Sequence, residues 1–168
     1  MSEQPQGVPM PEVHPVWEEL EANGPHVGIV IATEGDREQI EAACNELLER
    51  AITFEVRVLS AHANPREVAE YSSTAALRGI RVIIAAAGGA AALPGVIASY
   101  TELPVIGVPI DRGNLGGLDA LLSVVQMPEA VPVACMAING ARNAAIYAAK
   151  ILAQGGGSPH SDRWTATE

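Results

Sequence analysis

Aromatic residues, cysteines and long apolar runs are all scarce in this sequence of 168 residues. Aromatics make up 4% of it, so the core must consist of small aliphatic side chains, which suits helices packed closely on a parallel sheet. The two cysteines, Cys44 and Cys135, fall within a helical and a strand-like pattern, where free cysteine behaves as a small apolar residue. This placement argues against a metal or redox role for either thiol.

An excess of basic residues is also missing. Ten Lys and Arg stand against twenty Asp and Glu, which gives a formal net charge of −10 with no basic stripe to offset it. Nucleic acid and anionic membranes are therefore poor partners. No apolar run approaches the roughly 18 residues of a membrane span, and the N-terminus has no secretory pattern. We expect a soluble, cytoplasmic protein with one domain long enough to bury a sizeable core.

Strand-like and helix-like segments alternate from residue 26 to residue 154. Strands separated by helices of this length predict a parallel sheet with right-handed crossovers, in a three-layer αβα sandwich. Before this domain, residues 1–25 are expected to form an arm with a short helix, and residues 155–168 are expected to be a flexible tail. The expected strands are 26–32, 53–59, 80–86, 103–108 and 131–137, and the expected helices are 36–51, 65–78, 90–99, 117–126 and 141–154.

Five loops follow the carboxyl ends of the expected strands, which is where ligands bind in such sheets. The third of them belongs to the stretch A-A-A-G-G-A-A-A-L-P-G at 85–95, whose backbone is almost without side chains. A backbone of this kind permits close approach, and unpaired N–H groups at the start of the next helix favour a carboxylate or a phosphate. A tight turn that packs for structural reasons explains the stretch equally well. The five loops are 32–36, 60–64, 86–92, 109–116 and 138–142.

Two of these loops carry residues suited to chemistry. His62 lies at the carboxyl end of an expected strand, and histidine titrates close to neutral pH, as general acid–base catalysis requires. Capping of the next helix is the simpler structural role for it. Asp36 begins the first long helix, where a carboxylate is commonly an N-cap, yet its loop lies near that of His62. Arg112 and Arg142 are expected as exposed charges at the same edge.

Several blocks of the sequence together resemble the PurE family, the 5-(carboxyamino)imidazole ribonucleotide mutases and aminoimidazole ribonucleotide carboxylases of purine biosynthesis. They occur in the family's order and span about residues 27–153. The blocks are S-A-H at 60–62, A-A-A-G-G-A-A-A-L-P-G at 85–95, L-P-V-I-G-V-P at 103–109, G-L-D-A-L-L-S-V-V-Q-M-P at 117–128 and N-A-A-I-Y-A-A-K-I-L-A at 143–153.

The resemblance implies a flavodoxin-like αβα domain that assembles as a homo-octamer and uses no metal or organic cofactor. It also implies carboxylate transfer between the exocyclic nitrogen and the adjacent ring carbon of an aminoimidazole nucleotide, with CO₂ held in the glycine-rich loop. In this chain His62 would shuttle the proton, and Asp36 would belong to the catalytic centre with it. The substrate-binding residues that the resemblance implies are Thr33, Gly35, Ser60, Ala61, Ala87, Gly88, Gly89, Ala90, Leu93 and Arg112.

Four loops depart from the family pattern. The first loop reads A-T-E-G-D at 32–36 where the family has G-S-x-S-D, and the last loop, at 138–142, is shortened. Ala63 stands where the family has an arginine that helps to bind the nucleotide phosphate, and Ala92 stands in place of a second histidine. The family's own substrate is therefore expected to react slowly or not at all, unless Arg112 or Arg142 binds the phosphate from another direction.

Two other functions remain open on the sequence. The carboxylase of nickel-pincer cofactor synthesis has a similar glycine-rich turn without the second histidine, although it carries an additional N-terminal domain and lacks the Q-M-P block at 126–128. A non-catalytic protein with a binding or assembly role would also keep this fold. The leading hypothesis is an enzyme that moves, adds or removes a carboxylate on an aminoimidazole ribonucleotide or a related small aza-heterocycle.

Overall fold

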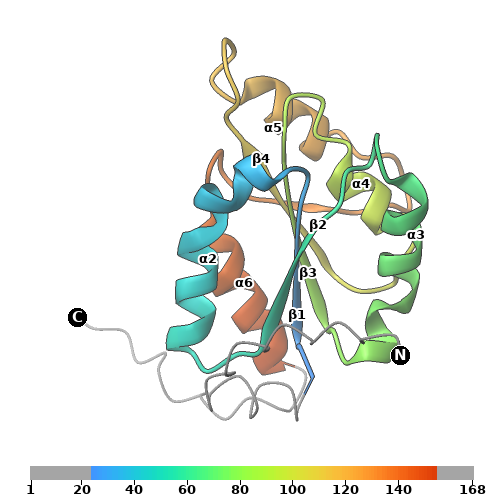
Figure 1. The fold of residues 1–168 in the computed structure, drawn as a ribbon, viewed down its shortest axis with the longest axis vertical. Helices are drawn as coiled ribbons and strands as arrows, with labels where there is room; N and C mark the ends of the chain where they lie inside the picture. Colours follow the sequence, from blue (N-terminus) through green and yellow to red (C-terminus); the bar gives the residue numbers. More distant parts are fainter. Residues whose placement is uncertain (1–23, 155–168) are drawn as a thin grey trace, which may run out of the picture.

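The computed structural model describes residues 24–154, and these form a parallel sheet with helices on both faces (Figure 1). The expected N-terminal arm with its helix and the expected C-terminal tail lie outside the described residues. The strands are β1 (Val27–Ile31), β2 (Phe54–Val58), β3 (Val82–Gly88), β4 (Val105–Ile110) and β5 (Ala134–Cys135). The helices are α2 (Arg37–Glu49), α3 (Pro65–Thr74), α4 (Leu93–Ala98), α5 (Leu118–Val125) and α6 (Ala141–Gln154), with 3₁₀ turns η1 (Glu34–Asp36) and η2 (Ala75–Arg78).

The strand order is β2-β1-β3-β4-β5, and each neighbouring pair runs parallel. β1 lies in the interior of the sheet; β2 pairs on one side of it, and the chain then crosses over to place β3, β4 and β5 on the other side. This is the flavodoxin-like order, and it places a change of direction next to β1. The expected three-layer αβα sandwich with a parallel sheet is confirmed.

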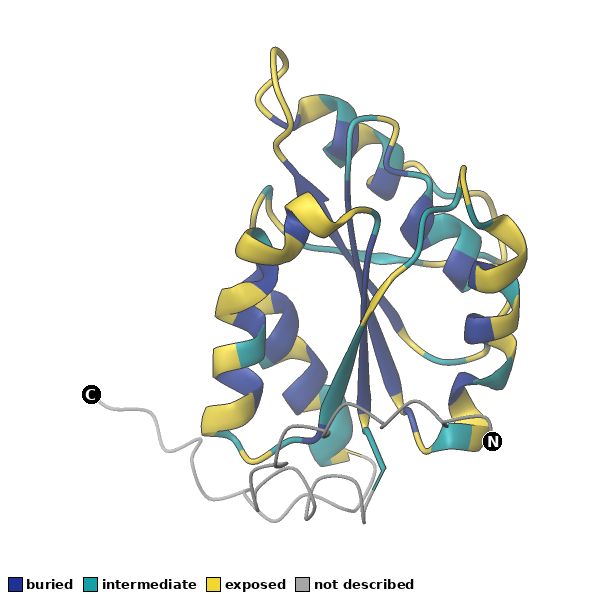
Figure 2. Ribbon diagram, viewed as in Figure 1, coloured by how far each residue is buried: buried dark blue, intermediate teal, exposed yellow. Residues whose placement is uncertain are grey.

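Two apolar clusters fill the space between the sheet and its helices. One cluster lies under α2 and α6, and the other lies under α3, α4 and α5. Figure 2 shows the helices exposed on their outer faces and buried where they meet the sheet. Ala144, Ala145 and Ala148 are fully buried, so α6 approaches both the sheet and α2 closely. Each fully buried Ile or Leu side chain contributes about 1.5–3 kcal/mol to this core.

A glycine in β4 allows α5 to pack directly on the sheet. An added Cβ at Gly107 would collide with Val124 of α5 and would lie 2.9 Å from Cγ1 of Val133. Both obstacles are β-branched side chains with little freedom to move away. Because β4 and α5 flank the 111–117 loop, their close contact fixes both ends of that loop.

The ends of three strands differ from the expectation. β3 and β4 each run two residues further than expected, because Ala87 pairs with Pro109 and Gly88 pairs with Ile110. β5 has two residues instead of the expected seven. It is an edge strand, and Pro132 has no N–H with which to extend its pairing. The longer β3 carries the sheet right up to the glycine-rich turn.

Candidate active site

The loops after β1, β2, β3 and β4 meet at the carboxyl edge of the sheet. Two backbone hydrogen bonds join the first loop residues after β1 and β2 to the neighbouring strand: the Leu59 N–H donates to the Ile31 carbonyl at 2.9 Å, and the Ala32 N–H donates to the Ala86 carbonyl at 3.1 Å. Gly88 at the end of β3 pairs with Ile110 at the end of β4. The loops therefore leave neighbouring strands at the same height. The carboxyl edge can bring residues from all four loops into one site.

Asp36 is the best buried polar residue of this edge, with 1% of its side chain exposed. The Thr33 N–H donates to its Oδ2 at 3.1 Å. This bond is part of the capping box at the start of η1, the 3₁₀ turn that precedes α2. Arg112 Nε donates to its Oδ1 at 2.8 Å. Arg112 Nη2 donates to the same Oδ1 and to the Thr33 hydroxyl. Asp36 occupies the N-cap position of α2, but its carboxylate makes no cap hydrogen bond to that helix. It caps the preceding turn η1 instead, and its ion pair with Arg112 joins two loops.

The stem of Arg112 lies across Gly88 at the end of β3. An added Cβ at Gly88 would lie 2.5 Å from Cδ and 2.6 Å from Cγ of Arg112, and 2.9 Å from the carbonyl oxygen of Ile110. A side chain at Gly88 is therefore incompatible with this position of Arg112. Arg112 connects the first, third and fourth loops of the edge, and the sequence interpretation of it as a simple exposed charge missed this pairing.

The glycine-rich stretch forms a tight turn between β3 and α4. The Ala91 N–H donates to the Gly88 carbonyl at 3.2 Å, and the turn needs positive φ angles at Gly89 (+62°) and Ala91 (+30°). No atom lies within 4 Å of the place where Gly89 would carry a Cβ. The positive φ of Ala91 is a strained conformation of the kind that persists at functional sites. The main chain is open to close approach at Gly89, as the sequence suggested.

His62 is exposed on the loop after β2. The Ser60 hydroxyl accepts the N–H groups of His62 at 3.3 Å and of Ala63 at 3.2 Å, which fixes the backbone of the loop. Asn64 occupies the N-cap position of α3, so His62 is not the cap. Among residues 24–154, no side chain or backbone group hydrogen bonds to the His62 imidazole. The ring is available to a ligand, but the structure does not join it to the pair of Asp36 and Arg112.

The remaining expected site residues divide into two groups. Ala90 is exposed and Ala61 is half-buried at the loops, while Gly35 lies beside Arg112, with 4.0 Å between an added Cβ and Nη2. Ala87 and Leu93 are each 1% exposed. Their side chains belong to the core, so a role in binding would fall to their backbone.

Arg142, expected as a second cation that could reach a phosphate, is held by α2 instead. Its Nε donates to Glu46 Oε2 at 2.8 Å, and Arg50 Nε donates to Glu46 Oε1 at 2.8 Å. The hydrogen bond from Arg142 is the main reason why the pKa of the Glu46 carboxyl lies below its usual value. Glu46 is almost fully buried, so this arrangement joins α2 to α6 rather than forming part of the site.

Other features of the described chain lie apart from the carboxyl edge. Burial raises the pKa of the Cys44 and Cys135 thiols and favours their neutral form. Within residues 24–154, no group of three or more His, Cys, Asp or Glu side chains is placed to hold a metal ion. None of the helices in that range is long and apolar enough to cross a membrane.

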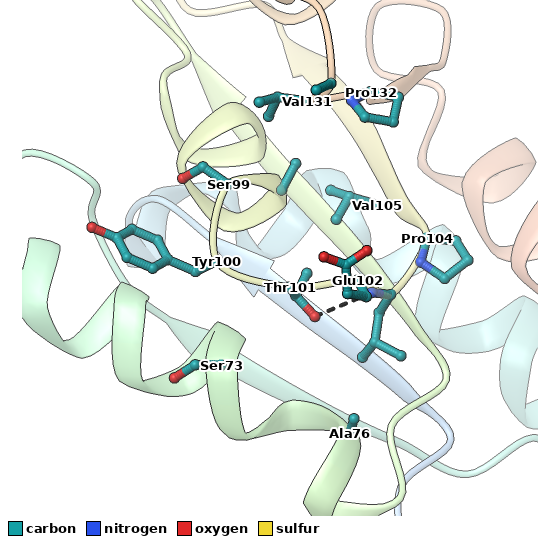
Figure 3. A pocket seen from close by; sticks show the side chains of 13 residues that line it. Ser73, Ala76, Ser99, Tyr100, Thr101, Glu102, Pro104, Val105, Val131 and Pro132 are labelled. Atoms are coloured by element: carbon teal, nitrogen blue, oxygen red, sulfur yellow. Dashed lines mark hydrogen bonds between the residues drawn. The ribbon is translucent and has the colours of Figure 1, made fainter.

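A cavity of about 830 Å³ opens at the amino edge of the sheet, near the start of β4 (Figure 3). Tyr100, Glu102 and Pro104 are among the residues that line it. The Thr101 hydroxyl accepts the Leu103 N–H at 3.2 Å within its wall. No expected site residue contributes to this cavity, so it is distinct from the loops of the carboxyl edge.

Comparison with known proteins shows the family of this chain. The family model for AIR carboxylase matches residues 26–160, which is most of the chain. This chain belongs to the AIR carboxylase family. It is 53% identical over 128 residues to the N5-carboxyaminoimidazole ribonucleotide mutase of Saccharolobus solfataricus, covering 76% of this chain and 81% of the relative. It is 52% identical to the mutase of Thermotoga maritima, covering 76% of this chain and 75% of that enzyme.

More distant members of the AIR carboxylase family extend the comparison. The phosphoribosylaminoimidazole carboxylase of Candida glabrata is 47% identical over 145 residues, which are 84% of this chain and 25% of that longer protein. The crystal structure of Treponema denticola PurE superposes with a TM-score of 0.70 at 27% identity, covering 77% of this chain and 81% of the other. The PurE resemblance seen in the sequence is confirmed, and identities near 50% do not require this chain to be a divergent member.

Proposed function

We propose that this protein is a mutase that moves a carboxylate from the exocyclic nitrogen to the adjacent ring carbon of an aminoimidazole ribonucleotide. The observation that carries the proposal is the identity of 53% and 52% with two proteins named as N5-carboxyaminoimidazole ribonucleotide mutases. These relatives are covered over at least three quarters of their length, whereas the chain spans only a quarter of the Candida carboxylase. The mutase reaction is therefore favoured over the carboxylase reaction.

His62 is the proton carrier in this proposal. The bond between the exocyclic nitrogen and the carboxylate breaks, its electron pair stays on nitrogen, and the nitrogen takes a proton from the His62 imidazolium. The ring carbon then attacks the released CO₂, and the proton displaced from that carbon returns to the neutral imidazole. One group can serve both steps because histidine exchanges protons near neutral pH. The exposed ring, free of hydrogen bonds to residues 24–154, supports this role.

The glycine-rich turn provides the place for CO₂ between the two steps. A small, linear molecule of this kind needs main chain without projecting side chains, and Gly89 offers open space at that point. If the released CO₂ stays beside the ring carbon, the two react without having to meet again in solution, which speeds the second step. The backbone at Gly88, Gly89 and Ala90 is accordingly proposed as the wall of the CO₂ site.

The purified protein is expected to convert N5-carboxyaminoimidazole ribonucleotide slowly, with kcat/KM below about 10⁴ M⁻¹s⁻¹, the lower end of the common enzymatic range. The reason is the altered recognition at Ala63 and Ala92, where the family pattern has an arginine and a histidine. Steady-state formation of the carbon-carboxylated product measures this value. A higher kcat/KM would show that another residue, such as Arg112, replaces the lost contact, and no conversion above the rate without protein would contradict the proposed reaction.

We also propose that the protein works in the cytoplasm as a homo-octamer. Four apolar side chains of α5 and the loop before it, Leu115, Leu118, Leu122 and Val125, are at least half exposed in the single chain. A row of this kind commonly marks a protein contact. Light scattering at micromolar concentration is expected to give about eight times the chain mass of 17.5 kDa. A mass near that of one chain would contradict the assembly.

A further inference from the structure

We propose that Arg112 binds the anionic group of the substrate, a phosphate or a carboxylate, and that Asp36 is a positioning residue that acts through Arg112. The inference rests on the function proposed above and names the residue that sets specificity at the same site. It changes the expected role of Asp36, whose carboxylate was assigned to the catalytic centre on the family resemblance.

The contacts of Asp36 indicate an indirect role. Its carboxylate is 1% exposed, and both oxygens are occupied: Oδ1 by Arg112 and Oδ2 by the Thr33 N–H. A ligand that reached this carboxylate would first have to displace Arg112. The simpler arrangement is that Asp36 holds the guanidinium in place through Nε and Nη2 and leaves its other side able to attract an anion.

One edge of the Arg112 guanidinium remains available. Nε and Nη2 donate to Asp36 and Thr33, whereas Nη1 has no hydrogen-bond partner among residues 24–154. The side chain is 36% exposed, so a ligand can reach it. An arginine that is already fixed in position loses less conformational freedom on binding an anion, and its charge-assisted hydrogen bonds are stronger than neutral ones. Arg112 is therefore a prepared donor.

The position of Arg112 places that donor beside the proposed CO₂ site. Its stem lies on Gly88, with 2.5 Å between Cδ and an added Cβ at that residue. The neighbouring arginines of the edge are less suitable. Arg37 pairs with Glu34 at 2.8 Å, and Arg142 is bound to Glu46. Arg66, exposed in the first turn of α3, is the alternative cation, and α3 directly follows the His62 loop.

Binding of four ligands by calorimetry separates the two anionic groups. Aminoimidazole ribonucleotide carries the phosphate alone, its riboside carries neither group, and the carboxylated product and its riboside carry the carboxylate with and without the phosphate. Arg112→Ala is expected to raise the Kd of the ligand that bears the recognised anion by about tenfold or more, and to leave the Kd of the plain riboside within about twofold. Arg112→Lys should recover part of the affinity, since it keeps the charge without the fork.

Asp36→Asn tests the positioning role. It should weaken binding of the same anionic ligand as Arg112→Ala and leave the plain riboside unaffected, whereas a purely structural role of Asp36 would lower affinity for all four ligands alike. Arg142→Ala is the matched control. It also removes an arginine from this edge, but one that is bound to Glu46 and is not proposed to bind the ligand. Circular dichroism and thermal unfolding of each variant show whether the fold is retained.

The possible outcomes decide between the claims. Loss confined to the two ligands that carry the phosphate assigns Arg112 to the phosphate, and loss confined to the two ligands that carry the carboxylate assigns it to the carboxylate. Unchanged affinities in Arg112→Ala, or a loss that appears in Arg66→Ala instead, would overturn the inference. The proposed function would still stand in that case if the wild-type enzyme turns over its substrate. Arg112-dependent binding without any turnover would keep the inference and remove the proposed function. A wild-type protein that binds none of the anionic ligands contradicts both.

Discussion

His62→Asn is expected to lower kcat for carboxylate transfer by about 10²–10⁴-fold, the usual contribution of a general acid–base group. Asparagine keeps a similar size and the ability to form hydrogen bonds, but it cannot carry a proton at neutral pH. Stability should change by less than about 0.5 kcal/mol, because His62 is exposed and its ring has no hydrogen bond to residues 24–154. Steady-state turnover and thermal unfolding measure the two quantities separately.

His26→Asn is the matched control for this variant. His26 precedes β1 at the amino edge, and its Nδ1 lies 2.9 Å from the Thr53 hydroxyl, so its loss should leave kcat unchanged. Near-normal turnover by His62→Asn would show that another group moves the proton. If neither the wild-type protein nor the variant turns over any substrate, the non-catalytic interpretation of the fold gains support.

Gly88→Ala is expected to lower kcat/KM by about 10²-fold, because it adds one methyl group where three loops meet. The new Cβ would lie 2.6 Å from Cγ of Arg112 and 2.9 Å from the Ile110 carbonyl oxygen. The Arg112 side chain can move away, but the backbone of β4 cannot do so without disturbing its pairing with β3. Displacement of reacting groups by about 1 Å is enough for a loss of this size.

Gly95→Ala in α4 is the corresponding control. Its added Cβ would also be crowded, at 2.9 Å from the terminal methyl of Met127, but this is the end of a flexible side chain that can turn aside. Alanine also favours the helix by up to about 1 kcal/mol relative to glycine. Activity close to that of the wild type is expected. Equal losses in the two variants would mean that the effect at Gly88 is general crowding.

The sequence predicted the architecture well because its signals are local. Alternating apolar runs and helix-forming segments, with Asn64 and Pro65 at the start of one helix, are set by neighbours in the chain. Exact strand ends depend on the partner strand instead. The last two residues of β3 form because Pro109 and Ile110 lie beside them, and this is a property of the folded sheet.

The sequence predicted which loops and residues form the candidate site, but not which side chains pair with one another there. The rule that ligands bind at the carboxyl edge pointed to the loops that carry Asp36, His62 and Gly88. The bond between Asp36 and Arg112 joins residues 76 positions apart, and no local pattern encodes it. The same holds for Arg142, whose partner Glu46 is 96 positions away. Exposed arginines can be located from a sequence, whereas the carboxylate that each one binds depends on tertiary packing.

The central claim is that this protein transfers a carboxylate from nitrogen to carbon on an aminoimidazole ribonucleotide. It is tested most directly with a substrate that carries ¹³C in the nitrogen-bound carboxylate, followed by NMR with the purified protein and without it. The claim predicts that the label appears in the carboxylate on the ring carbon, faster with the protein than without it. Label that passes only into bicarbonate, at the same rate in both samples, would contradict it.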